Sequence, residues 1–401
     1  MKRWANKNVK YTEMKRGNIL FIQNLELTNQ QMEKQEEFKA FVDSEIVPAA
    51  GHIDQEENMP DSVLQKIIDK GNWGAALPAK YGGADMDYIT YGLWNEEIGR
   101  GCASLRNIIG VQGMVTSSIL RWGSQEQKQY WLPKMSSGEL KVSFAITESQ
   151  IGSDIKNLQT KAQRVGTEYV ISGQKKWITF AQKADVFLVF AQCDGQAVAL
   201  LVERNTPGLT VRPISGLVGF RGSLLAELSF EECRVPVDNL VGKVGFGLAL
   251  VANNGLTHGR YSTAWGAAGL AQACLNASLD YINERKQFDH YLKEHQLIQQ
   301  MIADMVTNTI AARHLCFRAG QLWDNNEVNA TFATSLAKYF STVHAFKAAK
   351  DAVQIHGANG CSSEYPVERH MRDAKVMEIV EGSTQIQQVL IAQDAFNMFN
   401  N

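Results

Sequence analysis

The sequence predicts an α+β protein of several domains, in which two helical parts flank a β domain. Three observations support this: apolar residues recur at helical spacing up to Gly138, alternate at strand spacing from about Leu140 to Gly242, and return to helical spacing from Gly245. A chain of 401 residues can build two or three such domains. We expect an N-terminal extension, a helical domain, an antiparallel β domain and a C-terminal four-helix bundle, with bounds 1–27, 28–139, 140–243 and 244–401.

The N-terminal part reads as a loose extension followed by helices. Its first residues are polar and aperiodic. Helical patterns follow at residues 30–50, where we expect an end near Pro48, and from residue 61, where we expect an end near Gly71. A turn in LPAKYGGADMDY precedes a further helix at residues 89–101.

The middle and C-terminal parts differ sharply in their patterns. Short runs such as VSFAIT, ADVFLVFAQ and AELSFEECRVP are rich in Val, Ile and Phe and are separated by Gly, Pro and Asn, which is typical of strands. Long helical patterns at residues 263–288 and 295–323 then indicate a bundle.

Composition excludes several classes of function. The sequence has 40 Lys and Arg residues against 42 Asp and Glu residues, so it lacks the basic excess of a nucleic-acid-binding protein. No apolar run reaches the length of a membrane span. The six cysteines are scattered singly, which indicates neither a metal site nor disulfides and fits a cytoplasmic location. HExxH, Walker and Rossmann motifs are absent, so any nucleotide cofactor is held by another kind of loop.

A carboxylate between two predicted helices is the first candidate for chemistry. In RHMRDAKVMEIVEGSTQIQQ, residues 369–388, the helical pattern breaks at Gly382 and a second helix follows, capped by Ser383 or Thr384. Glu381 stands at this break. A solvated loop acid and a catalytic base in a dry cleft both fit the position, and in the second case desolvation would raise the pKa of the carboxyl group.

Two stretches of the β part could face a planar ligand. In FAITESQIGSD, residues 144–154, Thr147, Ser153 and neighbouring amides could hydrogen-bond a heterocycle; the alternative is an ordinary polar loop. In KKWITF, residues 175–180, Trp177 and Thr179 offer a flat face and a hydroxyl; the alternative is a tryptophan in the core.

Two stretches of the C-terminal part could approach phosphates or a ligand backbone. In ERKQFDHYLKEHQ, Arg285 and Lys286 could bind a pyrophosphate, or they could belong to a solvated helix face. In QIHGANGC, Gly357 and Gly360 allow a close approach to a ligand, or they could end a helix.

Together and in this order, these stretches resemble the acyl-CoA dehydrogenase superfamily from about Thr28 to Phe399. The similarity is carried by FAITESQIGSD, GQKKWITF, FEECRVPVDNLVG, ERKQF with the following EHQ, DAVQIHGANG and RDAKVMEIVEGSTQ. The resemblance implies the fold of that family and an FAD between the β domain and the C-terminal helices. It also implies a homo-oligomer, a tetramer or a dimer, in which a neighbouring subunit completes the site.

The resemblance assigns the FAD-binding residues in groups. The isoalloxazine side matches Phe144, Ile146, Thr147, Trp177, Ile178 and Thr179. The pyrophosphate and adenosine side matches Arg285, Phe288 and Gln296, together with His295, and the nearby loop matches Ser383 and Gln385. The contribution of a second subunit matches Gln354, Gly357 and Gly360.

Glu381 matches the catalytic base of most members of the superfamily. The resemblance implies that it removes the α-proton of an acyl thioester while a hydride leaves the β-carbon for flavin N5. The backbone N–H of Glu381 and the flavin ribityl chain would donate to the thioester oxygen. Ser153 and Gly382 are expected beside the substrate.

Two features bear on the acyl group and its carrier. Members that use CoA usually have an acid three residues before the arginine of the first long C-terminal helix, but here Thr257 precedes Arg260. LTHGRYSTAWG and ASLRNIIGVQG look more like members that oxidise small polar acyl groups on an acyl carrier protein, in polyketide and other antibiotic biosynthesis. Glutaryl-CoA dehydrogenases also resemble the chain here, so we expect Arg106 to point into the acyl pocket and to bind a polar substituent. The alternative is a surface arginine or one between helices. Arg260 is also expected to bind the substrate.

The sequence therefore predicts a cytoplasmic, FAD-dependent acyl-thioester dehydrogenase with an electron acceptor such as an electron-transfer flavoprotein. One alternative is a dehydrogenase of a short-chain or dicarboxylic acyl-CoA. Another is a flavin oxidase or monooxygenase on the same fold. A non-catalytic member is disfavoured by the intact Glu381, and no metal, nucleic-acid or membrane partner is expected.

Overall fold

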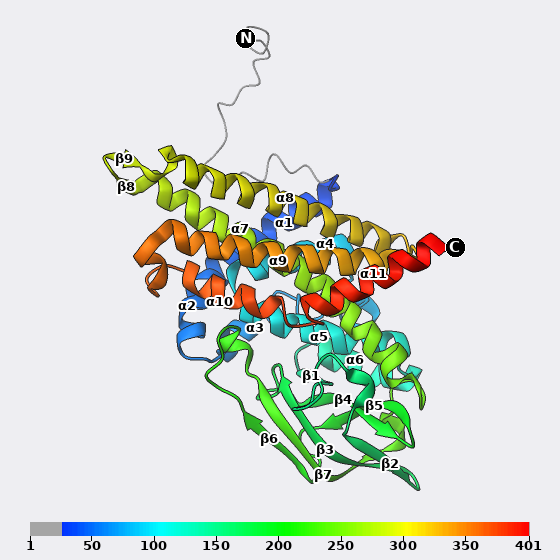
Figure 1. The fold of residues 1–401 in the computed structure, drawn as a ribbon. Helices are drawn as coiled ribbons and strands as arrows, with labels where there is room; N and C mark the ends of the chain where they lie inside the picture. The colour runs from blue at the N-terminus through cyan, green and yellow to red at the C-terminus, as the bar shows by residue number, and fades with distance from the viewer. Residues whose placement is uncertain (1–25, 401) are drawn as a thin grey trace.

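The computed structural model describes residues 26–400 of the chain. All but the last two residues of the predicted N-terminal extension therefore lie outside the described part. Figure 1 shows long helices that cover one side of a twisted β domain. None of the helices between residues 26 and 400 is both long and apolar enough to cross a membrane.

The N-terminal part is helical, as predicted. Its helices are α1 (Asn29–Phe41), α2 (Val47–Gln55), α3 (Asp61–Asp69), α4 (Tyr88–Gly101), α5 (Ala103–Trp122) and α6 (Gln125–Ser136). Thr28 forms a capping box with Gln31 at the start of α1. The expected helix end near Pro48 is wrong. A π-helical segment, Val42–Ile46, joins α1 to α2, and Pro48 lies in the first turn of α2, where a missing N–H costs little.

The middle part is a seven-stranded sheet with the order β1-β4-β2-β3-β7-β6, and β5 pairs with β4. The strands are β1 (Val142–Ala145), β2 (Lys161–Val165), β3 (Glu168–Ile178), β4 (Val186–Cys193), β5 (Gln196–Glu203), β6 (Leu209–Pro213) and β7 (Ala226–Pro236). Most pairs are antiparallel, as expected, but β1 and β2 each pair with β4 in parallel. Residue alternation did not reveal this difference, because side chains alternate in both kinds of pair.

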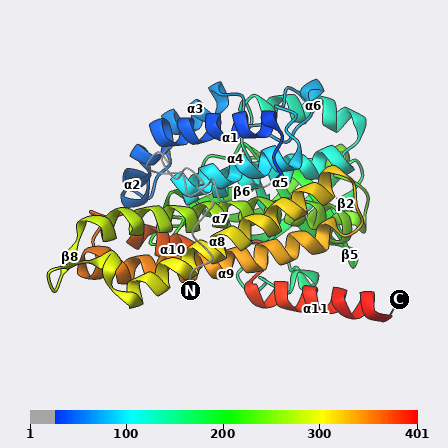
Figure 2. The same cartoon turned by 90° about the horizontal axis from the view of Figure 1, so that it is seen from above.

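The C-terminal part is a helical bundle. Its helices are α7 (Asn253–Glu284), α8 (Gln296–Asp324), α9 (Ala330–His356), α10 (Val367–Met377) and α11 (Thr384–Asn400). A π-helical segment, Gly247–Ala252, leads into α7, and a hairpin of β8 (Lys286–Gln287) and β9 (His290–Tyr291) joins α7 to α8. Figure 2 shows α7, α8 and α9 side by side, with α11 along the outer side of α9.

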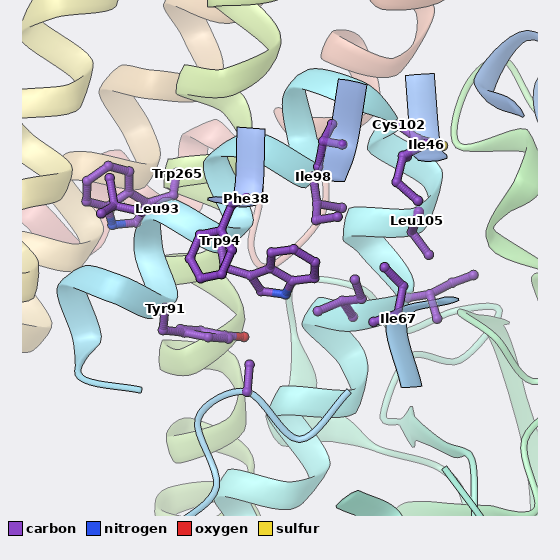
Figure 3. Close-up of a cluster of buried hydrophobic side chains, with 14 of the residues drawn as sticks. Phe38, Ile46, Ile67, Tyr91, Leu93, Trp94, Ile98, Cys102, Leu105 and Trp265 are labelled. Carbon is purple, nitrogen blue, oxygen red and sulfur yellow. The ribbon is translucent and has the colours of Figure 1, made fainter. Parts of the chain in front are cut away.

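The two helical parts share one core. Trp94 of α4 packs against Phe38 of α1, with ring centroids 5.1 Å apart, and Trp265 of α7 enters the same cluster (Figure 3). Helices α4 and α7 approach closely where α7 carries Gly269, because a Cβ there would lie 1.9 Å from the carbonyl oxygen of Glu96. This packing fixes α7 against the N-terminal helices, and α7 forms one wall of the site described next.

Candidate active site

Elements of all three parts meet around one cleft of about 410 Å³. Strands β1 and β3, helices α5 and α7, and the turn between α10 and α11 surround it. Many residues predicted from the sequence line this cleft: Phe144, Ile146, Thr147, Ser153, Trp177, Ile178, Thr179, Arg260, Glu381, Gly382 and Ser383. Residues far apart in the chain thus form one site.

The β wall of the cleft presents a tryptophan ring. The pairing of β3 with β7 is irregular between Lys175 and Ile178, and Trp177 has a φ of 62° there. The irregularity turns the ring out of the sheet, so that 48% of Trp177 is exposed. Beside it, the Thr179 hydroxyl accepts a hydrogen bond of 3.1 Å from Nδ2 of Asn107. The wall therefore combines a flat aromatic face with a hydroxyl.

A buried ion pair anchors the loop that follows β1. Nζ of Lys175 lies 2.8 Å from Oε1 of Glu148 and donates to the carbonyl of Ile146 at 3.1 Å. Glu148 also accepts the N–H groups of Gln159 and Thr160 at 2.7 and 3.0 Å. Burial opposes ionisation of Glu148, but these hydrogen bonds and the charge of Lys175 hold its pKa below the usual value. The loop is thus fixed at both ends where it borders the cleft.

Glu381 lies in a turn rather than in a helix, as the sequence predicts. Helix α10 ends at Met377 and α11 begins at Thr384, with Ser383 Oγ accepting the N–H of Ile386 at 3.4 Å. Glu381 and Gly382 have φ values of 57° and 89°, so the turn is left-handed at both residues. This backbone costs little at Gly382 but is uncommon for a glutamate, and such strain occurs often at functional sites.

The turn is held so that Glu381 faces the cleft. Nε of Arg260 donates to the carbonyl of Glu381 at 3.2 Å, and Nε2 of Gln387 donates to the same oxygen at 3.3 Å. A Cβ on Gly259 would lie 2.8 Å from Cδ of Glu381, so only a glycine at that position of α7 leaves room for the carboxylate. Within residues 26–400, the carboxylate itself forms no hydrogen bond or ion pair with the protein.

Electrostatics at Glu381 are set by burial and by cations on three helices. Burial raises the pKa of the Glu381 carboxyl group, while the charges of Arg106, Arg260 and Lys338 oppose this rise. A carboxylate with a raised pKa that points into a cleft is suited to accept a proton near neutral pH.

Arg106 lies behind the cleft rather than among its lining residues. It is 1% exposed, and its Nη1 donates to Oγ1 of Thr263 at 2.9 Å. Burial lowers the pKa of Arg106 to about 10, which leaves it charged at neutral pH. Its Nε has no partner in the described part of the chain, and Asn107, the next residue, does line the cleft. A surface location is therefore excluded, and a location between α5 and α7 beside the cleft is observed.

The remaining predicted residues do not reach this cleft within one chain. Figure 1 shows the β8–β9 hairpin at one end of the helices, away from the turn between α10 and α11. The residues outside the cleft are Arg285, Phe288, His295 and Gln296 around the hairpin, Gln354, Gly357 and Gly360 at the end of α9, and Gln385 in α11. Phe288 is 88% exposed. The predicted contact of these residues with FAD, which for Gln354, Gly357 and Gly360 is made by a second subunit, stays a prediction.

Sequence reasoning missed part of the α5 wall. Asn107, Val111 and Met114 line the cleft, and they follow one another at the spacing of a single helix face. That spacing was visible in ASLRNIIGVQGM, but it also describes an ordinary core helix. The sequence does not show whether this helix face borders a cleft or the core, because that depends on tertiary packing.

Comparison with known proteins identifies the family. Residues 28–139, 143–233 and 245–396 match the N-terminal, middle and C-terminal domains of acyl-CoA dehydrogenases. The chain belongs to the acyl-CoA dehydrogenase family. The probable acyl-CoA dehydrogenase YngJ of Bacillus subtilis is 41% identical over 379 residues, which is 92% of this chain and 99% of that protein. The protein is accordingly an FAD-dependent oxidoreductase that acts on CH–CH groups of acyl thioesters.

Solved structures of this family show the same fold. A glutaryl-CoA dehydrogenase of Mycobacterium smegmatis in complex with FADH2 is 28% identical, with a TM-score of 0.90 over 94% of this chain and 97% of that chain. The prolyl acyl carrier protein oxidase AnaB is 29% identical, with a TM-score of 0.88 over 92% and 99%. FkbI, which serves the biosynthesis of a methoxymalonyl extender unit of a polyketide, is 30% identical, with a TM-score of 0.82 over 91% and 99%.

The cleft of this acyl-CoA dehydrogenase fits a flavin ring. Phe144, Ile146 and Ile178 give an apolar wall, Trp177 gives a flat face, and the hydroxyls of Thr147 and Thr179 can bond to the polar edge of a heterocycle. No cluster of metal-ligating side chains occurs in residues 26–400. The donor set thus suits FAD and gives no support for a metal there.

Proposed function

We propose that Glu381 is the base that removes the α-proton of the acyl thioester. The observation that carries this proposal is a carboxylate that faces the cleft from a left-handed turn, with a raised pKa and no partner in the described chain. When bound, FAD takes up the hydride that leaves the β-carbon. The protein positions the thioester, excludes water from the reacting atoms and accepts the proton on the Glu381 carboxylate.

Backbone donors of the same turn support binding of the thioester oxygen. The N–H groups of Glu381 and Gly382 have no acceptor among residues 26–400. The carbonyl of Glu381 is held by Arg260 and Gln387, so the peptide that follows has a fixed orientation. Free and oriented N–H groups beside a base are suited to stabilise the enolate formed by removal of the α-proton.

The substrate in our proposal is a small acyl group with a polar substituent. Arg106 supports this, because it is a buried cation with an unpaired Nε, next to Asn107 of the cleft. A polar or anionic group that reached this guanidinium would satisfy the unpaired donor, whereas a purely apolar chain would leave it unsatisfied. Arg260 and Ser153 line the same cleft, where they can contact the thioester.

The carrier in our proposal is an acyl carrier protein. Thr257 is 5% exposed and neutral at the position where CoA-using members usually have an acid. AnaB and FkbI, by their titles an acyl carrier protein oxidase and an extender-unit biosynthesis protein, share the fold over most of the chain. We propose a cytoplasmic enzyme of polyketide or related antibiotic biosynthesis that works with an electron acceptor such as an electron-transfer flavoprotein.

We also propose a homo-oligomer, a tetramer or a dimer, in which one copy completes the cofactor site of another. Arg285, Phe288 and Gln354 support this, because they match FAD-binding positions of the family and lie outside the cleft of their own chain. The oligomeric state can be measured by light scattering of the FAD-loaded protein.

The test offers the FAD-loaded enzyme a panel of acyl groups and records bleaching of the flavin absorbance. Butyryl, glutaryl, glyceryl and seryl groups are each presented on CoA and on a carrier protein. We expect rapid bleaching by a polar acyl group on the carrier protein. Glu381→Gln should retain FAD and bleach about 10²–10⁴-fold more slowly; a near-normal rate would contradict the assignment of the base.

Two further results would redirect the proposal. Bleaching by butyryl-CoA or glutaryl-CoA alone would favour a dehydrogenase of short-chain or dicarboxylic acyl-CoA. Rapid reoxidation of the reduced flavin by oxygen would favour an oxidase, a possibility to which AnaB, named an oxidase, gives specific support. Arg106→Leu should abolish the preference for polar over apolar acyl groups, while Arg234→Leu, which removes an exposed arginine paired with Glu168 at 3.2 Å, should not.

A further inference from the structure

A buried lysine contacts the turn that carries Glu381. Lys338 lies in the first half of α9 and is 0% exposed. Its Nζ donates a hydrogen bond of 2.8 Å to the carbonyl oxygen of Gly382. Lysine is almost never fully buried without a strong reason, because removing its charge from water is costly.

The bond from Lys338 completes the support of a strained backbone. Both carbonyls of the Glu381–Gly382 turn point to donors of the protein: that of Glu381 to Arg260 and Gln387, and that of Gly382 to Lys338 and, at 3.4 Å, to Gln387. Lys338 forms the shortest of these bonds. A left-handed glutamate persists only when its surroundings hold it, and three separate elements, α7, α9 and α11, do so here.

The charge of Lys338 acts on the same carboxylate. The charged groups that face Glu381 are Arg106 from α5, Arg260 from α7 and Lys338 from α9, with Glu378 as the further acid near Lys338. Glu378 is itself paired with Lys375 at 2.8 Å. The site thus holds more positive than negative charge before substrate binds. When Glu381 accepts a proton, it becomes neutral, and the excess cations then face the negative enolate left on the substrate.

We propose that Lys338 is a positioning residue of this enzyme, which fixes the left-handed turn through the carbonyl of Gly382 and keeps Glu381 ionised through its charge. The proposal rests on the role of Glu381 as the base. Through Lys338, α9 controls when the base is ready to accept a proton, although this helix contributes no side chain to the lining of the cleft.

The test separates charge from scaffolding by two variants. Lys338→Met removes both the charge and the donor, and Lys338→Arg keeps a charge. The rate of flavin bleaching by the best thioester of the panel is measured against pH in a single turnover. In Lys338→Met, the acidic limb of the pH–rate profile, which reports ionisation of Glu381, should move to higher pH by about one unit. The reason is that a nearby opposite charge lowers a carboxyl pKa by this amount or more. With Arg, the limb should stay near its original position.

A second measurement needs no substrate. The infrared C=O band of protonated Glu381, identified by its loss in Glu381→Gln, is titrated in the FAD-loaded protein. It should persist to higher pH in Lys338→Met than in the unmodified protein. Lys347→Met is the matched control, because Lys347 lies on the same helix, is exposed and pairs with Asp304 at 2.6 Å. This control should shift neither the band nor the limb.

The outcomes are distinguishable. A normal bleaching rate in Glu381→Gln would reject the proposed base and leave nothing for Lys338 to position. An inactive Glu381→Gln, with an unshifted limb and band in Lys338→Met, would reject the role of Lys338 alone. A rate that falls equally at every pH would reject the action of the Lys338 charge on Glu381 and would leave only its support of the turn. If the Met variant does not fold, Lys338→Gln, which keeps a donor without the charge, is measured in its place.

Discussion

Gly259 determines how closely the carboxylate of Glu381 can approach α7. A Cβ at this position would lie 2.8 Å from Oε2 of Glu381 and 2.8 Å from Sδ of Met114. Neither distance is compatible with a normal contact, and the carboxylate, which no hydrogen bond anchors, would move more easily than the backbone. The lack of a side chain at Gly259 therefore allows the base to face the cleft.

We expect Gly259→Ala to impair the reaction without weakening the fold. Alanine favours a helix over glycine by about 1 kcal/mol, which offsets the cost of shifting the flexible ends of Met114 and Glu381, so the free energy of unfolding should change little. The displaced carboxylate should slow flavin bleaching by about a hundredfold. Unfolding in urea and single-turnover bleaching, measured on the same preparation, check both parts. A variant that is both stable and fully active would show that Glu381 does not need its observed position.

For single residues, the sequence predicted the identity of the site residues better than their backbone geometry. Glu381, Trp177 and Thr179 were predicted from their motifs, and all lie at the cleft. The left-handed backbone of Glu381 was not predictable, because a glycine such as Gly382 suggests a positive φ in a sequence and a glutamate does not. Lys338 was not singled out, because a lysine in a helical pattern is normally solvated and its burial depends on the distant turn that it meets.

At the scale of elements, the crossing of α4 and α7 depends on glycine. A Cβ on Gly269 of α7 would lie 1.9 Å from the carbonyl oxygen of Glu96 in α4, and one on Gly99 would lie 2.4 Å from the carbonyl of Gly266. Backbone atoms cannot move aside as a side chain can. The glycines therefore set the distance between the two helices, and with it the position of the α7 wall of the cleft.

We expect Gly269→Ala to destabilise the protein by about 1–3 kcal/mol, as overpacking usually does, despite the better helix propensity of alanine. The free energy of unfolding from a urea titration measures this. Gly152→Ala is the control, because no atom lies within 4 Å of the added Cβ, and its stability should be unchanged. Equal stability of both variants would show that α4 and α7 can separate at no cost.

Elements themselves were largely predictable from periodicity. The helices α4 and α8 lie within one residue of the predicted ranges, and for α4 the Asp87 cap and Gly101 mark the two ends. The π-helical segments Val42–Ile46 and Gly247–Ala252 were not predicted, since an extra residue in one turn leaves little trace in the apolar pattern. The parallel pairing of β1 with β4 was not predicted, because side chains alternate in parallel and in antiparallel pairs alike.

At the scale of the whole molecule, α10 connects all three parts of the chain. Arg372 donates to both carboxylate oxygens of Asp54 in α2, at 2.9 and 2.5 Å, and to the carbonyl of Val218 at 3.2 Å. The neighbouring Asp373 accepts the N–H of Phe220 at 2.7 Å. The helix that leads to the Glu381 turn is thereby fixed to the N-terminal helices and to the β domain at once.

Asp373 should make stability depend on pH in a direction opposite to that of most acids. Burial raises its pKa from 3.8 to about 6, so the folded protein binds the proton more tightly than the unfolded chain. The contribution of this group to stability is therefore complete at low pH and declines as pH rises through this interval. Asp373→Asn, which keeps an oxygen for Phe220, should remove that decline. Free energies of unfolding at several pH values check this; identical slopes in both proteins would contradict it.

The carboxylate of Glu381 has no hydrogen-bonding partner in the described chain, and this has a consequence for descent. Its loss would break no hydrogen bond and open no hole in the interior, because it borders space that is already empty of protein; only the cations Arg106, Arg260 and Lys338 would lose the acid that faces them. A duplicated copy of such a gene can therefore lose its catalytic activity through one substitution at Glu381 and still encode a folded protein that binds the cofactor. Selection on shape alone would not restore the lost acid.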